Sequence, residues 1–260
     1  MSRTNNKWIR PYLNGYRIGG WAANIGNVGY KCDVQPEHAY TDAVKNSVAG
    51  FAEIAVDPIN TILAPDVATG VFELCNSGLG TYDYMIAYGA PGEPITGNPM
   101  FAWRFEQAGY EADPGSGFVM ANIALSTTFV TNNPAVLGGY GSPWGVLAHA
   151  DGAETAANTA IGIDDWGAVT LPNRGGLFFW HLFSSDGTVT LSLEEASTNS
   201  NGSFGALSGA TSGSITAAVL PKSGQVALSN TAAVKRYIRW QMAKGTAGTA
   251  TFALGWIRGR

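Results

Sequence analysis

The sequence contains few cysteines and few charged residues for its length. Among 260 residues, Cys32 and Cys75 are the only two cysteines, and they lie far apart. That count excludes a disulfide scaffold and a zinc site built from cysteines. Charged residues make up 13% of the chain and the net charge is −4, whereas globular proteins average roughly 25% charged residues. A disordered chain would need more net charge and fewer aromatic residues, and a nucleic-acid binder would need a basic excess.

Long apolar runs and the common catalytic motifs are missing as well. The longest apolar run, FVMANIAL at residues 118–125, is far shorter than the roughly 18 residues of a membrane-spanning helix. The opening MSRTNNKWIR lacks the apolar stretch of a secretory leader. No nucleophile elbow, phosphate-binding loop, zinc-protease or EF-hand pattern occurs. We therefore expect a protein without catalytic residues, metal ligands or cofactors, and without a membrane partner.

The sequence around the three histidines, His38, His149 and His181, indicates no catalytic or metal site. His149 and Asp151 form the sole His/Asp neighbour pair; we expect a loop histidine beside a turn aspartate, with a metal or catalytic role as the alternative. His181 lies in the apolar run LFFWHLF, which indicates a core position. The tandem acids 164–165 and 194–195 would face opposite sides of a strand, and so would not form an acid/base couple.

Aromatic residues and alternating patterns indicate a β protein. The chain has 8 Trp, 10 Tyr and 11 Phe, which is ample core material. We expect strands at 7–13, 51–56, 82–88, 100–110, 118–125, 177–183, 188–193, 215–219, 225–228, 235–242 and 249–257. Asn14-Gly15 is a hairpin turn signal. Polar loops are expected at 35–46 and 199–213, and one helix at 66–76.

Asn/Pro and Gly/Pro clusters at 132–143 indicate a linker. We therefore expect a mainly β fold in two domains. Residues 1–131 form an N-terminal antiparallel β-sandwich or barrel with one helix, and residues 144–260 form a C-terminal β-sandwich.

Charges are segregated along the chain. All 19 acids lie between Asp33 and Glu195, whereas basic residues gather at both ends. Ordinary solvated surface is one interpretation. The other is assembly, in which basic ends of one copy meet the acidic middle of the next. The candidate subunit-interface residues are Lys7, Arg10, Arg17, Lys235, Arg236 and Arg239.

The first half resembles the tail tube (major tail) proteins of long-tailed bacteriophages. The residues that carry the resemblance are the strand–turn–strand segment 12–21 (YLNGYRIGGW), the strand start at 25–30, the polar segment 40–45 and the helix near 66–76. The second half is similar to accessory β-sandwich modules of phage structural proteins, through residues 203–209, 235–240 and 251–258.

The resemblance implies a virion structural protein made in the host bacterial cytoplasm. Copies would form homo-oligomeric rings, hexameric in that family, stacked around a channel that passes DNA without binding it specifically, alongside other virion proteins. Two alternatives stay open. One is a capsid decoration protein. The other is a carbohydrate-binding or adhesin module that uses Trp144, Trp166, Trp180 and Trp240.

Overall fold

The protein is described here by a computed structural model, which covers residues 6–20, 22–37, 46–62, 74–75, 80–113, 120–127, 143–165, 174–229, 231–245 and 248–259. Within these ranges the chain is nearly all β, and its helical segments are short. The strand pairings are antiparallel. The expected mainly β fold class is confirmed.

The strands of the first half are β1 (Ile9–Leu13), β2 (Tyr16–Arg17), β3 (Ala22–Asn24), β4 (Val28–Glu37), β5 (Asn46–Val56), β6 (Ile59–Ile62), β7 (Thr81–Tyr88), β8 (Pro99–Asp113) and β9 (Met120–Thr127). Those of the second half are β10 (Trp144–Glu154), β11 (Ile163–Asp164), β12 (Gly176–Ser185), β13 (Val189–Ala196), β14 (Gly205–Ile215), β15 (Lys222–Ala227), β16 (Tyr237–Lys244) and β17 (Ala250–Arg258). Four 3-10 turns complete the described elements: η1 (Asn6–Trp8), η2 (Ile18–Gly20), η3 (Asn201–Ser203) and η4 (Ala217–Val219).

One large sheet runs through both halves of the chain. Its strand order is β15-β12-β17-β10-β8-β7-β1-β2, and β9, β6 and β3 branch from β8. The halves join where β10 pairs with β8, with Trp144 opposite Phe101. The tight turn between β1 and β2 is the expected one: Asn14 and Gly15 both have positive φ, 47° and 85°, as a two-residue hairpin turn requires.

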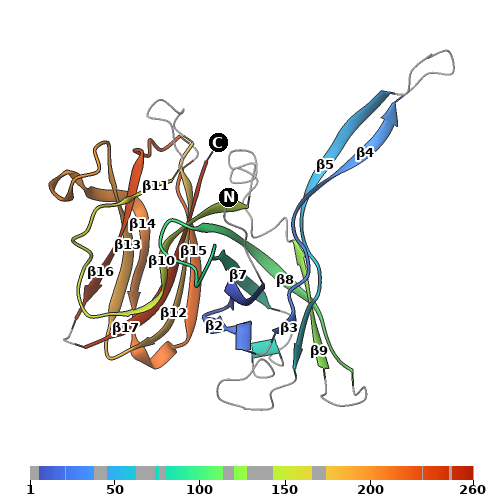
Figure 1. The fold of residues 1–260 in the computed structure, drawn as a ribbon, viewed down its shortest axis with the longest axis horizontal. Coiled ribbons are helices and arrows are strands. Elements are labelled where there is room, and N and C mark those ends of the chain that lie inside the picture. The colour runs from blue at the N-terminus through green and yellow to red at the C-terminus, as the bar shows by residue number, and fades with distance from the viewer. Residues whose placement is uncertain are drawn as a thin grey trace.

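The second half forms a two-layer β-sandwich (Figure 1). A four-stranded sheet, β11-β16-β13-β14, covers one face of β10, β12 and β17. The buried cluster between the layers includes Phe178, Trp180, Leu193, Trp240 and Trp256. Aligned sheets packed about 10 Å apart bury such alternating side chains between them.

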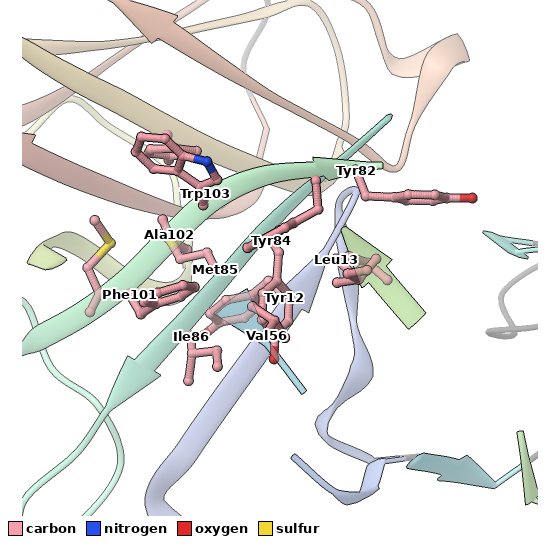
Figure 2. Close-up of a cluster of buried hydrophobic side chains, with 14 of the residues drawn as sticks. Tyr12, Leu13, Val56, Tyr82, Tyr84, Met85, Ile86, Phe101, Ala102 and Trp103 are labelled. Atoms are coloured by element: carbon pink, nitrogen blue, oxygen red, sulfur yellow. The ribbon is translucent and has the colours of Figure 1, made fainter. Parts of the chain in front are cut away.

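A second buried cluster covers the other face of β10, β12 and β17 and includes side chains from both faces of β7 and β8. Figure 2 shows its centre, where aromatic and aliphatic side chains from β1, β7 and β8 pack together. Leu147, Leu177, Phe179, Ala253 and Ile257 of the second half belong to the same cluster. Strand β12 is thus covered on both faces, and the expectation that LFFWHLF is buried on both sides is confirmed.

Some local expectations were wrong. The segment 199–213 is not one polar loop, because β14 begins at Gly205. Its small Ser, Gly, Thr and Ala residues still pair along β13, and bulges with positive φ at Gly209 and Gly213 bend the strand. The expected strand at 215–219 is instead the end of β14 followed by η4.

Two further expectations fall largely outside the described residues. Of the helix at 66–76, the structure describes Leu74 and Cys75, which are helical. Of the linker at 132–143, it describes Pro143, whose carbonyl accepts the Ala102 N–H at 3.0 Å. The division into domains 1–131 and 144–260 therefore stays a prediction, to be weighed against the sheet and core that the two parts share.

Candidate functional site

Strands β4 and β5 form a hairpin that extends away from the rest of the molecule (Figure 1). The ladder runs from Val28 opposite Val56 to Glu37 opposite Asn46, with a bulge between Cys32 and Val34. Ten residues of β4 span roughly 33 Å at about 3.3 Å per residue. In the described part of the chain, each strand forms a ladder only with the other, so beyond Ile54 no further described strand is added to either outer edge.

The base of the hairpin is held by the core and by one carboxylate. Ile54 and Val56 are buried and belong to the core cluster around β7 and β8. Asp57 Oδ2 accepts the backbone N–H of Asn27 at 3.1 Å and its side-chain amide at 2.9 Å, while Asp57 N–H donates to Asn27 O at 2.9 Å. The direction of the hairpin is therefore set by the body, although its far end lies beyond that support.

Sequence reasoning missed this hairpin, because residues 35–46 were expected to be a polar loop. The structure places residues 35–37 and 46 in the strands, and residues 38–45 lie outside the described ranges. The alternation of Val28, Tyr30, Cys32 and Val34 was an available strand signal. The polar residues that follow at 35–46 favoured a loop instead.

The basic residues at the chain ends do meet the acidic middle, but within one chain. The N-terminal pairs are Arg10–Glu93 and Arg17–Asp151. The C-terminal pairs are Lys235–Glu195, Arg236–Asp164 and Arg239–Glu194. Lys7 lies 5.1 Å from the centre of the Trp8 ring. The six candidate interface residues thus form two separate groups, and a role in subunit contacts stays a prediction for each.

The His149/Asp151 pair does not form. His149 is buried on β10, not in a loop, and its Nε2 lies 3.0 Å from Glu154 Oε1 and its Nδ1 3.2 Å from Phe252 O. Asp151 instead holds the Arg17 guanidinium. Burial lowers the pKa of His149, an effect that the hydrogen bond to Glu154 opposes. The arrangement is that of a packed side chain between the rings of Trp240 and Phe252.

The tandem acids bind different partners, as strand geometry predicts. Asp164 pairs with Arg236 on the surface. Asp165 is buried with Arg258 and accepts the Trp256 indole N–H at 2.7 Å. Within the described ranges no three His, Cys, Asp or Glu side chains gather as a metal site, and no helix is long and apolar enough to span a membrane.

The tryptophans named for the carbohydrate alternative are mostly buried. Trp180 is 5% exposed and Trp240 8%, whereas Trp144 is 40% exposed; Trp166 lies outside the described residues. Trp144 packs on Tyr88 and, edge-on, on Phe101. A sugar-stacking face needs exposed, coplanar rings, and the three described tryptophans of this set do not offer one.

No protein-family model matches the chain, and no curated protein matches it. Among solved structures, it is similar to the SPP1 Dit (gp 19.1) protein, described as a paradigm of the hub adsorption apparatus in phages that infect Gram-positive bacteria. That match has a TM-score of 0.33 and 13% identity, and covers 94% of this chain and 98% of that chain. The phage p2 baseplate, in an activated conformation with Sr, matches with a TM-score of 0.30, 8% identity and coverage of 95% and 97%. Matches at this level assign no function.

Proposed function

We propose that this chain is a structural subunit of a phage tail, which assembles into rings of identical copies that stack around a DNA channel. The observation that carries the proposal is the β4–β5 hairpin, a two-stranded ribbon whose edges beyond Ile54 pair with no other described strand. Isolated two-stranded hairpins are marginally stable in water, and open edges are sites where other chains add strands. Pairing with neighbouring copies would supply the missing strands.

The acidic surface of the first half supports a channel for DNA. Glu106 and Glu111 are exposed on β8 and have no ion-pair partner in the described residues. The one basic residue of β7, β8 and β9, Arg104, is bound to Asp83 at 2.7 Å. A wall of this kind offers phosphates no cationic contacts, which are the main source of non-specific DNA binding. DNA would pass without being held.

Electron microscopy of the purified protein tests the proposal, with sedimentation velocity as the matching solution measurement. We expect stacked rings or tubes. A variant in which residues 33–51 are replaced by an Asn-Gly turn should remain a folded monomer, since Cys32 and Ala52 face each other in the ladder. Monomers of the full chain that coat capsids would favour the decoration alternative. Single rings that never stack would favour a place at the tail end. Assembly that the shortened variant retains would contradict the role of the hairpin.

A further inference from the structure

The β1–β2 turn of the first half lies against β12 and β15 of the second half. A Cβ atom built on Gly15 would be 2.6 Å from the backbone N of Lys222, so only glycine fits there. Asn14 Oδ1 accepts the Asp83 N–H at 2.8 Å and lies 3.3 Å from the Ser223 hydroxyl, which also donates to Asp83 Oδ2 at 3.0 Å. We call this contact, formed by Asn14, Gly15, His181 and Ser223, the turn seam.

A buried histidine accepts a backbone hydrogen bond at the turn seam. His181 on β12 is 0% exposed, and its Nδ1 accepts the Gly15 N–H at 3.1 Å. An accepting Nδ1 carries no proton, so the ring is neutral and its proton is on Nε2. Nε2 has no hydrogen-bond partner in the described structure. The geometry therefore fits only the neutral ring.

Few charged groups face this ring. From β1, Tyr12 packs on it with ring centres 5.7 Å apart. From β7, Asp83 is the nearest acid, and it is already bound to Arg104 of β8. On β15 the residue opposite is Ser223, with Lys222 beside it; on β17 it is Ala253, which does not titrate. Burial lowers the pKa of His181 to about 4, and Asp83 only partly opposes that effect.

We propose that the turn seam is a pH-sensitive contact: protonation of His181 in mild acid releases the Asn14–Gly15 turn from β12 and β15. A proton on Nδ1 would point at the Gly15 N–H, so two donors would face each other. The positive charge would also be fully buried in the protein, which is costly for an incompletely paired charge. The β8–β10 pairing contains no histidine, so the two halves stay joined while the turn opens.

The direction of the effect follows from proton linkage. In the open state the ring has its ordinary pKa of about 6.5, whereas in the closed state it is about 4. Between these values the open state binds more protons, so opening becomes more favourable as the pH falls. The difference of about 2.5 pH units sets a ceiling of about 300-fold on the change in the opening equilibrium. Above about pH 6.5 the contact is insensitive to pH.

Hydrogen exchange of the Gly15 amide in the full-length protein measures this opening. After correction for intrinsic exchange, we expect its protection to fall by up to about 100-fold between pH 7 and pH 4. The Phe179 amide on the same strand as His181 serves as an internal reference and should keep its protection. In His181→Gln, whose side-chain oxygen can accept without titrating, the Gly15 protection should stay flat. The control variant His149→Gln should behave as the wild type.

Three results would overturn the proposal. One is Gly15 protection that does not change with pH in the wild type. Another is an equal loss in His181→Gln, which would assign the effect to carboxylates such as Asp83. The third needs no variant: an NMR titration of the wild-type histidine ring that shows His181 still neutral where Gly15 has already lost its protection.

Discussion

The β4–β5 hairpin and the large sheet are built from strands of similar length, but their surroundings differ completely. Strand β17 lies between β10 and β12, with buried clusters on both faces of the sheet. Strands β4 and β5 form a ladder only with each other in the described structure, and Val28, Ile54, Val56 and Asp57 join their base to the body. The body therefore contains its own stabilising contacts, whereas under the proposed assembly the hairpin would gain contacts from other copies.

This contrast separates folding from assembly. Substitutions in the body should change the free energy of unfolding of the monomer. Changes in the hairpin should leave that free energy nearly unchanged and act on association, because strand pairing at open edges forms only when another copy is present.

Truncation of a core aromatic residue should destabilise the body most. Phe179 is 0% exposed and belongs to the cluster shared by the two halves. We expect Phe179→Ala to lower the free energy of unfolding by about 3–5 kcal/mol, measured by urea denaturation. The variant lacking 33–51 is the comparison and should unfold at nearly the wild-type midpoint. A large loss of stability in that variant would show that the hairpin is part of the folding core.

The neighbouring acids Asp164 and Asp165 allow a matched test of ion pairs. Arg258 and Asp165 are 6% and 1% exposed, so Arg258→Ala removes the cation from a buried carboxylate that keeps the Trp256 N–H, and should cost about 3–5 kcal/mol. Arg236 and Asp164 are 39% and 37% exposed, so Arg236→Ala should change thermal unfolding very little. Equal effects of the two variants would contradict the burial difference.

A glycine in the body and one in the hairpin should respond differently to a methyl group. Gly15 has φ of 85° and no space toward Lys222, so Gly15→Ala should cost about 2 kcal/mol or more. Gly29 on β4 has nothing within 4 Å of an added Cβ, so Gly29→Ala should be close to neutral. Differential scanning calorimetry of both variants checks this, and a destabilised Gly29→Ala would indicate contacts around β4 within the monomer.

Salt should have the smallest effect on assembly. Arg10, Arg17, Lys235, Arg236 and Arg239 already have acidic partners in their own chain. Arg239 is buried, and exposed pairs such as Arg236–Asp164 contribute about 0–1 kcal/mol each. Strand pairing through backbone groups is insensitive to screening, so sedimentation in about 1 M salt, where the Debye length is about 3 Å, should still show assemblies. Dissociation by salt would instead support these residues, with Lys7, as contacts between copies.

Two strands of the second half and one turn of the first half could be predicted from local patterns. The alternation in TVTLSL predicts the buried positions of β13. The apolar run LFFWHLF predicts a strand that is covered on both faces. Asn14-Gly15 gave the β1–β2 turn, because positive φ at two positions is a local property of those residues. These features depend on neighbours in sequence or on a single buried face.

The hairpin and the pairing of charges could not be predicted in the same way. Residues 35–37 (QPE) lack the alternating apolar pattern of a half-buried strand, and the structure places them in a ladder with β5. Arg17 meets Asp151 across 134 positions, a contact that only the joining of β8 and β10 brings about. Small residues gave no signal for β14, whose register is set by β13 and by bulges.

The division at 132–143 stays a prediction with a direct test. Expression of residues 144–260 alone would expose Leu147, Leu177 and Phe179, which the first half covers. If the part is an independent domain, it should give a cooperative unfolding transition and a β-type circular dichroism spectrum. A fragment without such a transition would show that the shared core makes one folding unit.

Amide hydrogen exchange of the hairpin before and after assembly tests directly whether β4 and β5 pair with strands of other copies. In an antiparallel pair, alternate N–H groups of β4 and β5 point inward to the partner strand and the others point to the open edge. If copies pair through the hairpin, the outward amides in 29–37 and 46–53 should exchange rapidly in the monomer and become protected when copies assemble. Outward amides that exchange equally fast in both states would contradict it.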